Sequence, residues 1–285
     1  MNESVYAVAG AVVLYNPADN VLDELSSYID QISRLYVIDN SIQHNDMLVE
    51  RFREIPKIVY INNGGNKGIA TALNVAAQKA MHDDFGYLLT MDQDTRLSAN
   101  HVTTLMEGFI QDSTGKVAIM APRYTKRSEN QNQRYETVLM TMTSGNVLNL
   151  ASYKAAGPFM DELFIDHVDH EYCLRLNRSG MKVIQDNEVE ISHRPGTISE
   201  IDLLGAKFSF SSHSPRRLYY FCRNGFYVAK LYRKAFPSFT FTFLKLIMKE
   251  GCKVPFERQK ILRLQMMVKG YMDFRSRKFG ALSGS

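Results

Sequence analysis

The segment Gly86 to Thr95 (GYLLTMDQDT) contains the residues whose types and spacing point most directly to chemistry. Its apolar residues, Tyr87 to Met91, are typical of a strand buried in a parallel sheet, and two carboxylates, Asp92 and Asp94, follow. Paired carboxylates at the end of a buried strand are costly unless a cation binds there. Hard divalent cations such as Mg²⁺ take one or two carboxylates together with the oxygens of a substrate phosphate. The segment therefore predicts a metal-phosphate site.

The elements that must position these carboxylates follow from the hydrophobic pattern of the first 120 residues. Short apolar runs predict strands at residues 6–15, 35–38, 57–61, 87–91 and 116–120. Apolar residues at helical spacing predict helices at residues 19–33, 69–81 and 98–110, the last of them capped by Ser98. This alternation indicates right-handed βαβ units and a mainly parallel sheet flanked by helices, so the predicted fold class is α/β.

Polar residues follow the predicted strands, namely Asn16, Asp39, Asn66, Asp92 and Asp94. Because the carboxyl ends of parallel strands share one edge, where α/β proteins bind ligands, we expect these side chains to converge. The glycine-rich loop at 62–68 (NNGGNKG) runs into a helix, whose amide groups, with Lys67 beside them, suit a diphosphate or a nucleoside. A turn followed by a capped helix explains the same letters without any ligand.

Residues 164–178 predict a helix that begins with three carboxylates and two histidines. On such a helix Asp166 and Asp169 share one face, while His167, His170 and Glu171 share another. The pattern is neither HExxH nor HxxEH, which zinc hydrolases use, and an exposed, charged first turn is the simpler interpretation. The helix dipole would nevertheless keep Asp169 ionised, as a general base requires.

Two further groups of residues could contribute to a phosphate site. His193 follows a strand-like segment at 182–191, and a metal held by Asp94 and a diphosphate would have room for an imidazole. Further along, Arg216, Arg217 and Arg223 lie among aromatic residues, which suits either a clamp on a phosphate or an ordinary basic amphipathic helix.

Charge is distributed unevenly along this 285-residue chain, whose net charge is only +4. Residues 206–285 hold 17 Lys and Arg against three Asp and Glu, a net charge of +14, which leaves −10 for the remainder. Such a tail indicates nucleic acid, an anionic membrane face or an anionic ligand. Its mixture of Phe, Leu, Ile and Met with basic residues favours a membrane surface or a dimer face over RNA. Three scattered cysteines, without an apolar run of membrane-spanning length, predict a cytoplasmic protein.

The letters MDQDT alone leave three interpretations open. They match the DxDx[TV] motif of haloacid-dehalogenase-type phosphatases, in which the first Asp is a nucleophile, and they also resemble the DxD motif of nucleotide-sugar glycosyltransferases. A solvated turn is the third. Position favours the glycosyltransferase, because the phosphatase motif normally follows the first strand of its domain and this one follows the fourth.

Taken together, these segments resemble the inverting, GT-A-fold family 2 glycosyltransferases, and within them the bacterial rhamnosyltransferases of O-antigen and related polysaccharides. The resemblance covers nearly the whole chain and is carried by the order and spacing of AVVLYNP, VIDNS, NNGGNKGIATALN, LLTMDQDT, TSGNV, VDHEYCLRL, SHRPG, HSPRRLYYFCRN and GYMDFRSRKFG. It implies a GT-A catalytic domain at 1–205, with a nucleotide-binding half at 1–122 and an acceptor half at 123–205. A basic, aromatic helical region at 206–285 would follow.

The resemblance also implies roles for individual residues. Tyr15, Asn16 and Asp39 would hold the donor nucleoside. The nucleoside or diphosphate would also meet Asn66, Lys67, Gly68, Asp92 and Gln93. Asp94 and His193 would bind Mg²⁺ or Mn²⁺. Arg216, Arg217 and Arg223 would close over the diphosphate or meet the lipid-linked pyrophosphate of an acceptor. Asp169 falls where the family has its catalytic base, with Asp166 as the alternative, because Val168 stands where an acidic residue is common.

The same resemblance implies the partners. The donor would be dTDP-rhamnose, with a UDP- or GDP-sugar as the alternative, and the acceptor a saccharide or a polyprenyl-diphosphate-linked saccharide. We expect peripheral contact with the cytoplasmic face of an anionic inner membrane, a possible homodimer through the C-terminal helices, and no nucleic acid. The competing interpretations are an aspartyl-phosphate phosphatase and a non-catalytic, basic membrane- or RNA-binding protein.

Overall fold

The computed structural model describes residues 7–124, 133–191, 198–203, 206–211 and 213–282. It divides the chain into two compact units, Met1–Asp161 with Asp169–His193, and Glu162–Val168 with Arg194–Ser285. The second unit therefore includes a short segment from the middle of the expected 1–205 domain, and its C-terminal part begins at residue 194 instead of 206. The functions expected of the two domains stay predictions.

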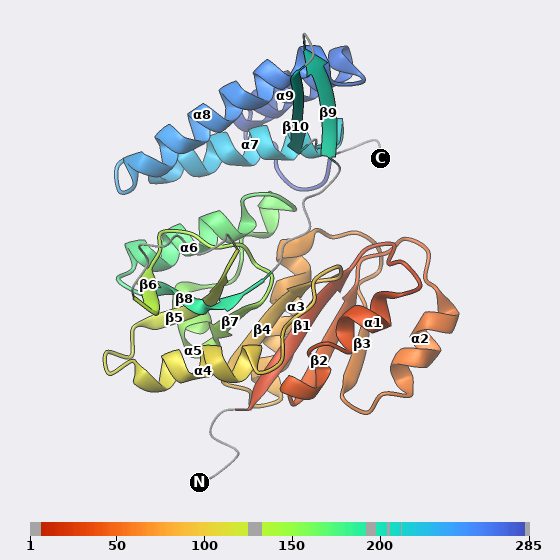
Figure 1. The fold of residues 1–285 in the computed structure, drawn as a ribbon, viewed down its shortest axis with the longest axis vertical. Helices are drawn as coiled ribbons and strands as arrows, with labels where there is room; N and C mark the ends of the chain where they lie inside the picture. Colours follow the sequence, from red (N-terminus) through yellow and green to blue (C-terminus); the bar gives the residue numbers. More distant parts are fainter. Residues whose placement is uncertain (1–6, 125–132, 192–197, 204–205, 212, 283–285) are drawn as a thin grey trace. The chain divides into compact units, whose positions relative to one another are not determined.

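In its described residues the first unit contains one sheet of eight strands, in the order β3-β2-β1-β4-β7-β5-β8-β6 (Figure 1). The strands are β1 (Val8–Leu14), β2 (Arg34–Asp39), β3 (Ile58–Asn62), β4 (Tyr87–Asp92), β5 (Val117–Arg123), β6 (Tyr135–Thr137), β7 (Asn146–Asn149) and β8 (Lys182–Glu190). Pairing is parallel from β3 through β4 and between β5 and β8, whereas β7 is antiparallel to both β4 and β5. The predicted α/β class with a mainly parallel sheet is confirmed.

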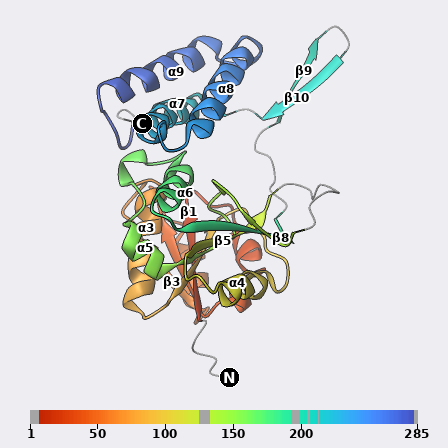
Figure 2. The same ribbon diagram turned by 90° about the vertical axis from the view of Figure 1, so that its left-hand side faces the viewer.

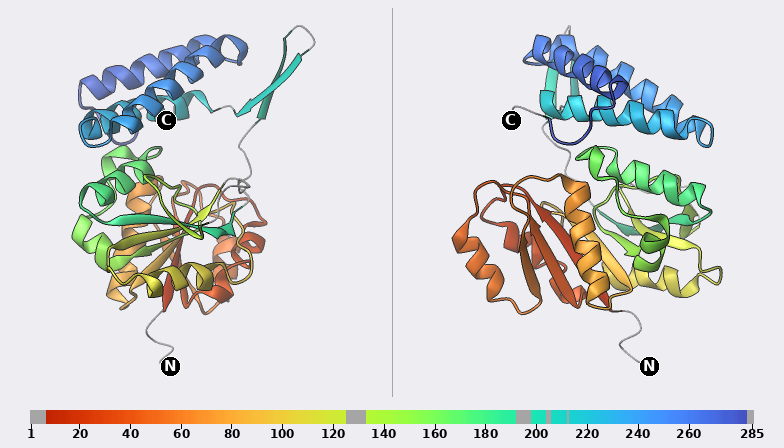
Figure 3. Two further views of the ribbon diagram at one scale, coloured as in Figure 1. Left: turned by 60° about the vertical axis from the view of Figure 1, so that its left-hand side comes forward. Right: turned by 180° about the vertical axis from the view of Figure 1, so that it is seen from behind.

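Helices cover both faces of this sheet. They are α1 (Val21–Leu25), α2 (Asp46–Arg53), α3 (Ile69–His82), α4 (His101–Gln111), α5 (Leu150–Ala156) and α6 (Val168–Arg178). Alternate residues of β1 separate the two faces, since Val8, Val12 and Leu14 pack in one core cluster with residues of α1, α2 and α4. The intervening Ala9 and Ala11 are fully buried, and α3 lies on the opposite face, against β1, β2 and β4 (Figure 3).

The second unit consists of a two-stranded antiparallel ribbon and three long helices. These elements are β9 (Ile198–Leu203), β10 (Ala206–Ser211), α7 (Pro215–Tyr232), α8 (Pro237–Lys253) and α9 (Lys260–Arg275). Both α8 and α9 pack on α7 (Figure 2). Gly270 permits the close approach of α9, because a Cβ there would lie 2.5 Å from the carbonyl oxygen of Tyr219. Among the helices in the described part of the chain, none is long and apolar enough to cross a bilayer.

Several elements differ from the sequence prediction. The helix expected at 19–33 breaks after α1 and ends in a 3₁₀ turn, Ile29–Gln31. The hydroxyls of Ser26 and Ser27 donate to the carbonyls of Asp23 and Glu24, at 2.8 and 2.7 Å, and such bonds compete with the helical ladder.

Helix boundaries account for the remaining differences. Asn100, in the left-handed conformation, precedes α4, so the expected cap at Ser98 is wrong. The sequence prediction missed α2, whose first turn is capped by Asn45 accepting a hydrogen bond from the Leu48 amide. Gly251 lies inside α8, which ends at Lys253 and is followed by a 3₁₀ turn, Val254–Phe256.

Candidate active site

The register of the sheet brings the polar strand ends of the first unit together. Leu14, the last residue of β1, pairs with Asp39 of β2, and the preceding Val13 pairs with Asp92 of β4. Asp39 in turn pairs with Asn62 of β3. The expected convergence is therefore observed, with the carboxylates of Asp39 and Asp92 on strands that flank the end of β1.

Hydrogen bonds tie the loops beyond these strands to each other. The Tyr15 amide donates to Gln93 Oε1 at 2.8 Å, which links the end of β1 to the DQD turn. The Asn16 amide donates to Ser41 Oγ at 2.8 Å, which links it to the turn after β2. Asn16 has a φ of 46°, a left-handed conformation that Asn tolerates better than most residues. Three of the predicted nucleotide-binding residues, Tyr15, Asn16 and Gln93, thus belong to one bonded set of loops.

Asp39 is the most constrained of the predicted binding residues. Its Oδ1 accepts the Ser41 amide at 2.8 Å, and its Oδ2 accepts the Tyr60 hydroxyl at 2.8 Å and lies 3.2 Å from His44 Nδ1. Burial would raise the pKa of Asp39, but the hydrogen bonds from Ser41, Tyr60 and His44 outweigh it and hold the pKa below its ordinary value. The carboxylate is therefore ionised, with its orientation fixed by three neighbours.

The glycine-rich loop is fixed at the start of α3. Asn66 Oδ1 accepts the Gly68 amide at 3.0 Å, and Asn40 Nδ2 donates to the Gly68 carbonyl at 3.1 Å. Gly68 has a φ of 87°, which glycine adopts without strain, at the N-cap position of the helix. Lys67 is exposed. The structure thus places Asn66, Lys67 and Gly68 at the helix N-terminus, as predicted, with Asn40 as their anchor.

Asp94 is the better placed of the two DQD carboxylates to bind a cation. Its side chain is exposed at the turn after β4, and within the described residues it has no hydrogen-bond or ion-pair partner. The other predicted ligand, His193, lies outside the described residues. Across the described residues, no group of three or more His, Cys, Asp or Glu side chains could hold a metal. A cation at Asp94 would therefore need ligands from beyond this set, such as phosphate oxygens.

Asp169 stands in the first turn of α6, near the end of β4. It lines a small internal cavity together with Thr90 of β4 and with Thr143 and Asn146, which precede and begin β7. Burial raises the pKa of the Tyr124 hydroxyl, and the charges of Asp92 and Asp169 raise it further. The predicted base and the first DQD carboxylate therefore both lie close enough to one phenol to influence its ionisation.

The segment before Asp169 is not helical, so the predicted helix forms only from Val168, and its expected start at Phe164 is wrong. Phe164, Asp166 and His167 adopt left-handed φ values of 61–65°. The expected sharing of a helix face by Asp166 and Asp169, and by His167 with His170, fails for the same reason. Positive φ is costly for residues with side chains, so contacts of this loop must hold it.

Those contacts come from α7 of the second unit, to which the segment Glu162–Val168 belongs. Asn224 Nδ2 lies 2.7–3.1 Å from the carbonyl oxygens of Leu163, Ile165 and Asp166. Arg223 donates to the carbonyls of Glu162 and Leu163, at 3.3 and 3.2 Å, and to that of Gly280 at 2.7 Å. We call the pair Arg223 and Asn224 the loop clamp.

The three arginines of α7 have different environments. Arg223 is 1% exposed and its guanidinium also stacks on Tyr219 and Tyr220, so the interpretation of Arg223 as a phosphate ligand is wrong. Arg217 forms an ion pair with Asp166 at 3.1 Å, and Arg216 is exposed. Both lie in the second unit, and their predicted contact with a diphosphate stays a prediction.

Sequence reasoning missed several residues that organise the site. Tyr60 and His44 hold Asp39, Tyr124 lies near Asp92 and Asp169, and the Asp92 amide donates to Ser144 Oγ at 3.0 Å. Ser144 and Asn224 do lie inside the segments TSGNV and HSPRRLYYFCRN, but their letters carry no indication of their partners.

Comparison with known proteins gives matches along most of the chain. The family model described as "Glycosyl transferase family 2" matches residues 11–172, more than half of the sequence. The "dTDP-rhamnosyl transferase RfbF" of Shigella flexneri is 28% identical over 247 residues, which cover 79% of this chain and 80% of that protein.

Solved structures resemble the chain in fold. GalNAc-T7 with UDP, GalNAc and Mn²⁺ gives a TM-score of 0.62 at 12% identity over 96% of this chain, which spans 57% of that one. S. aureus TarS 1-349 in complex with UDP-GlcNAc gives 0.55 at 13% identity, over 95% of this chain and 73% of that one. At these identities the likeness concerns the fold alone, and it confirms the expected GT-A architecture. The family match favours the glycosyltransferase interpretation of MDQDT over the phosphatase and the non-catalytic protein.

Proposed function

This chain belongs to glycosyl transferase family 2, and from that premise we propose that it transfers L-rhamnose from dTDP-rhamnose with inversion at the anomeric carbon. The proposed acceptor is a saccharide, free or carried on a polyprenyl diphosphate, in the synthesis of a cell-surface polysaccharide such as O-antigen. The enzyme would then work in the cytoplasm at the inner face of the membrane. The name of the Shigella flexneri relative supports this donor.

One observation supports the catalytic arrangement most strongly: Asp169 lines the same small cavity as Thr90, which stands two residues before Asp92 on β4. Asp92 ends β4, on the edge where α/β sheets bind their ligands. A base next to that edge would meet an acceptor hydroxyl beside a bound donor. Holding donor and acceptor in line supplies much of the acceleration in such a transfer.

Asp39 would recognise the nucleoside. Its low pKa keeps the carboxylate ionised and able to accept a hydrogen bond, and its contacts with Ser41, Tyr60 and His44 fix its direction. Tyr15 and Asn16 would lie beside the nucleoside, while Asn66, Lys67 and Gly68 would present a helix N-terminus and an ammonium to the diphosphate. Each of these residues lies on backbone that hydrogen bonds to neighbouring loops or strands already hold in place.

Asp94 has the chemistry of a ligand for Mg²⁺ or Mn²⁺, because its carboxylate is exposed and the hard oxygens of a diphosphate could complete the coordination. Such a cation would neutralise the charge that develops on the departing nucleoside diphosphate. We propose His193 as a further ligand. The Mn²⁺ named with GalNAc-T7 supports a divalent cation but does not identify the ion.

Asp169 would remove the proton from the acceptor hydroxyl. Its Oδ1 accepts the amide of His170 at 2.8 Å, so one oxygen is oriented by the backbone and the other can face the acceptor. General base catalysis of this kind contributes about 10²- to 10⁴-fold.

The substitution Asp169→Asn tests the base, and Asp166→Asn is its matched control three residues away. We expect Asp169→Asn to bind nucleotide as the wild type does and to lose about 10²- to 10⁴-fold in kcat. Asp166→Asn should retain most of kcat, because Asp166 is paired with Arg217 in the second unit. Normal transfer by Asp169→Asn, or a larger loss in Asp166→Asn, would show that the base is misassigned.

A panel of nucleotides tests the donor. We expect dTDP to raise the melting temperature more than UDP or GDP, and the gain to grow when Mn²⁺ is added, since ligands that bind only the folded state stabilise it. A larger gain in melting temperature with UDP or GDP would contradict the dTDP-rhamnose donor and indicate a glycosyltransferase that uses a different donor sugar.

A further inference from the structure

The outer faces of α8 and α9 in the second unit are apolar although nothing in the described residues covers them. Helix α8 buries Phe239 and Phe243, while Phe241 and Met248, on its opposite side, are 61% and 62% exposed. The buried side of helix α9 carries Arg263, Gly270 and Asp273. Its opposite side carries Ile261, Leu264, Val268 and Met272, which are 50–76% exposed. Spacings of three, four and seven residues put each set along one side of its helix.

On these helices and the turn between them, the acidic side chains are buried and most of the basic side chains are exposed. The three acidic residues between Pro237 and Lys278 are all buried, and each is paired with a basic neighbour: Glu250 with Lys253, Glu257 with Arg263 and Asp273 with Lys269. Seven basic residues remain exposed, and the described residues offer them no ion-pair partner: Lys245, Lys249, Arg258, Lys260, Arg275, Arg277 and Lys278. The exposed part of this segment is therefore positive and apolar, without an exposed carboxylate.

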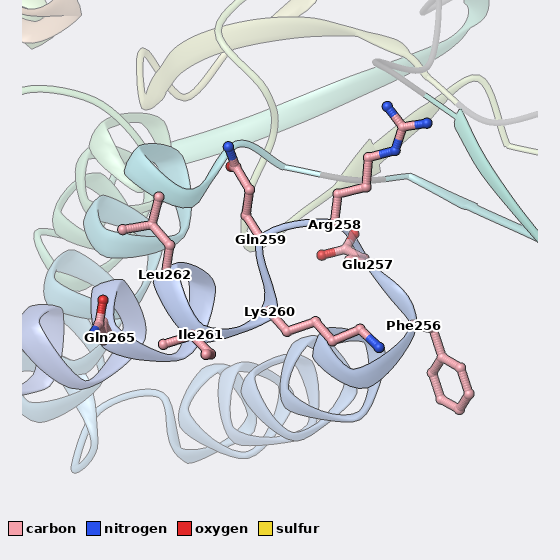
Figure 4. Close-up of a pocket in the computed structure, with 8 residues that line it drawn as sticks. All are labelled: Phe256, Glu257, Arg258, Gln259, Lys260, Ile261, Leu262 and Gln265. Carbon is pink, nitrogen blue, oxygen red and sulfur yellow. The ribbon is translucent and has the colours of Figure 1, made fainter.

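The turn between the two helices continues the same surface. An open hollow of about 810 Å³ is bordered there by Phe256, Arg258, Lys260 and Ile261, among others. Figure 4 shows the side chains of Phe256, Arg258 and Lys260 extending from this turn. Phe256 is 53% exposed, and Arg258 and Lys260 are exposed as well, so the turn between the two helices presents an aromatic ring and two cationic groups to solvent.

We propose that this surface, formed by the outer sides of α8 and α9 and the turn between them, docks on an anionic phospholipid bilayer. Apolar side chains of this kind enter the boundary between headgroups and acyl chains, while Lys and Arg meet the lipid phosphates. Lys245 illustrates both contributions, because its ammonium lies 4.3 Å above the Phe241 ring. The inference extends the proposed function, since a lipid-linked acceptor would be found at such a bilayer.

Two other occupants fit less well. A second copy of the chain would bring two positive surfaces together, and like charges at an interface oppose association. Single-stranded RNA would need aromatic rings as stacking platforms. The exposed apolar residues here are mainly aliphatic, such as Ile261, Leu264 and Val268. An anionic bilayer satisfies both the charge and the aliphatic character.

Sedimentation of the full-length chain with vesicles tests the inference. We expect binding to phosphatidylglycerol-containing vesicles, little binding to pure phosphatidylcholine, and weaker binding at high salt. The double variant Lys245→Gln/Lys249→Gln should lower the partition coefficient about 25-fold, since one Lys near such a surface contributes about fivefold. The matched control Lys116→Gln/Lys154→Gln, on exposed lysines of the first unit, should stay within twofold of the wild type.

Several results would overturn the proposal. Equal binding to neutral and anionic vesicles, or equal losses of binding in the variant and its control, would show that these basic residues do not bind the lipid phosphates. A dimer seen by light scattering and lost in Ile261→Ser/Val268→Ser would assign the surface to a second copy. Binding of poly(U) that is lost in Lys245→Gln/Lys249→Gln, without vesicle binding, would assign it to RNA. Because the assay contains neither donor nor acceptor, its failure is distinct from failure of the rhamnose proposal, which the nucleotide panel measures.

Discussion

The polar residues at the sheet edge of the first unit and the basic residues on the outer helices of the second unit differ in how they are held. At the edge, Asp39, Asn40 and Gln93 are each bonded to a neighbouring strand or loop, so their directions are set before any ligand arrives. On α8 and α9, residues such as Lys249 and Lys260 extend into solvent. A fixed set of groups suits one small anion, and a solvated set suits an extended anionic surface. Substitutions should therefore have local effects that depend on individual hydrogen bonds in the first case, and additive, salt-dependent effects in the second.

The largest effect should come from the loop clamp, which is as firmly bonded as the sheet edge although it lies on α7. We expect Arg223→Met to cost about 4 kcal/mol of unfolding free energy, because the carbonyls of Glu162, Leu163 and Gly280 lose a buried donor. Hydrogen exchange at residues 162–168 should rise. Because this loop leads directly into Asp169, kcat should fall at least tenfold while the melting-temperature gain with dTDP persists.

Arg258→Met is the control for that variant, since Arg258 is exposed in the same unit, and it should change stability by less than about 0.5 kcal/mol. If the two arginine variants were equally stable, the distinction between fixed and solvated basic residues would fail within the second unit.

The arginines of α7 also show what the sequence could and could not predict. Its letters present Arg216, Arg217 and Arg223 as one basic cluster, yet the structure leaves Arg216 exposed, pairs Arg217 with Asp166 and buries Arg223. Local spacing carries no information on which of them meets a loop some 60 residues earlier. The outcome depends on tertiary contacts that no window of sequence contains.

The sheet, by contrast, was predictable because its signals are local and repeated. Apolar runs such as Tyr87 to Met91 and the polar residue after each strand gave the order of elements and the shared edge. The predicted helix starts too early, at Phe164, because the letters before Val168 fit a helix as well as they fit a loop. In the structure Asn224 instead binds the carbonyls of Leu163 and Ile165 in a loop that precedes the helix. Partners such as Tyr60 for Asp39 could not be found, since pairing across strands depends on register.

A second large effect should come from Asn74, which is 5% exposed on α3. Its Nδ2 donates to the Phe159 carbonyl and to Asp161, and its Oδ1 accepts the Tyr153 hydroxyl and the Phe159 amide, at 2.8–2.9 Å. Asn74→Ala would leave several of these groups buried without partners, so we expect a loss of about 3 kcal/mol in urea unfolding. Asn20→Ala, at an exposed position with a negative φ and no side-chain cap hydrogen bond, is the control, and an equal loss there would contradict the role of burial.

His101 provides a pH-dependent effect of intermediate size. Burial lowers its pKa to about 4, against about 6.5 when unfolded, so the unfolded chain binds the additional proton between these values. Stability should therefore fall as the pH drops through this window, by about 2 kcal/mol from pH 7 to pH 5. His101→Gln should remove that part of the slope. An unchanged slope in the variant would assign the acid sensitivity to other groups.

The smallest effect tests how firmly Asp39 is fixed at the sheet edge. Tyr60→Phe removes the hydroxyl that donates to Asp39 at 2.8 Å and should cost about 1 kcal/mol of unfolding free energy at neutral pH. The hydrogen bond lowers the pKa of Asp39 in the folded state, so its contribution is present above the unfolded pKa and is lost as the pH falls through the folded one. The difference between variant and wild type should therefore shrink in acid, and the affinity for dTDP should fall a few-fold at neutral pH. Tyr271→Phe, on the exposed side of α9, should change neither quantity. A Tyr60→Phe protein with unaltered nucleotide affinity would mean that Asp39 is oriented by Ser41 and His44 alone, and that the bonds at this edge are more redundant than those of the loop clamp.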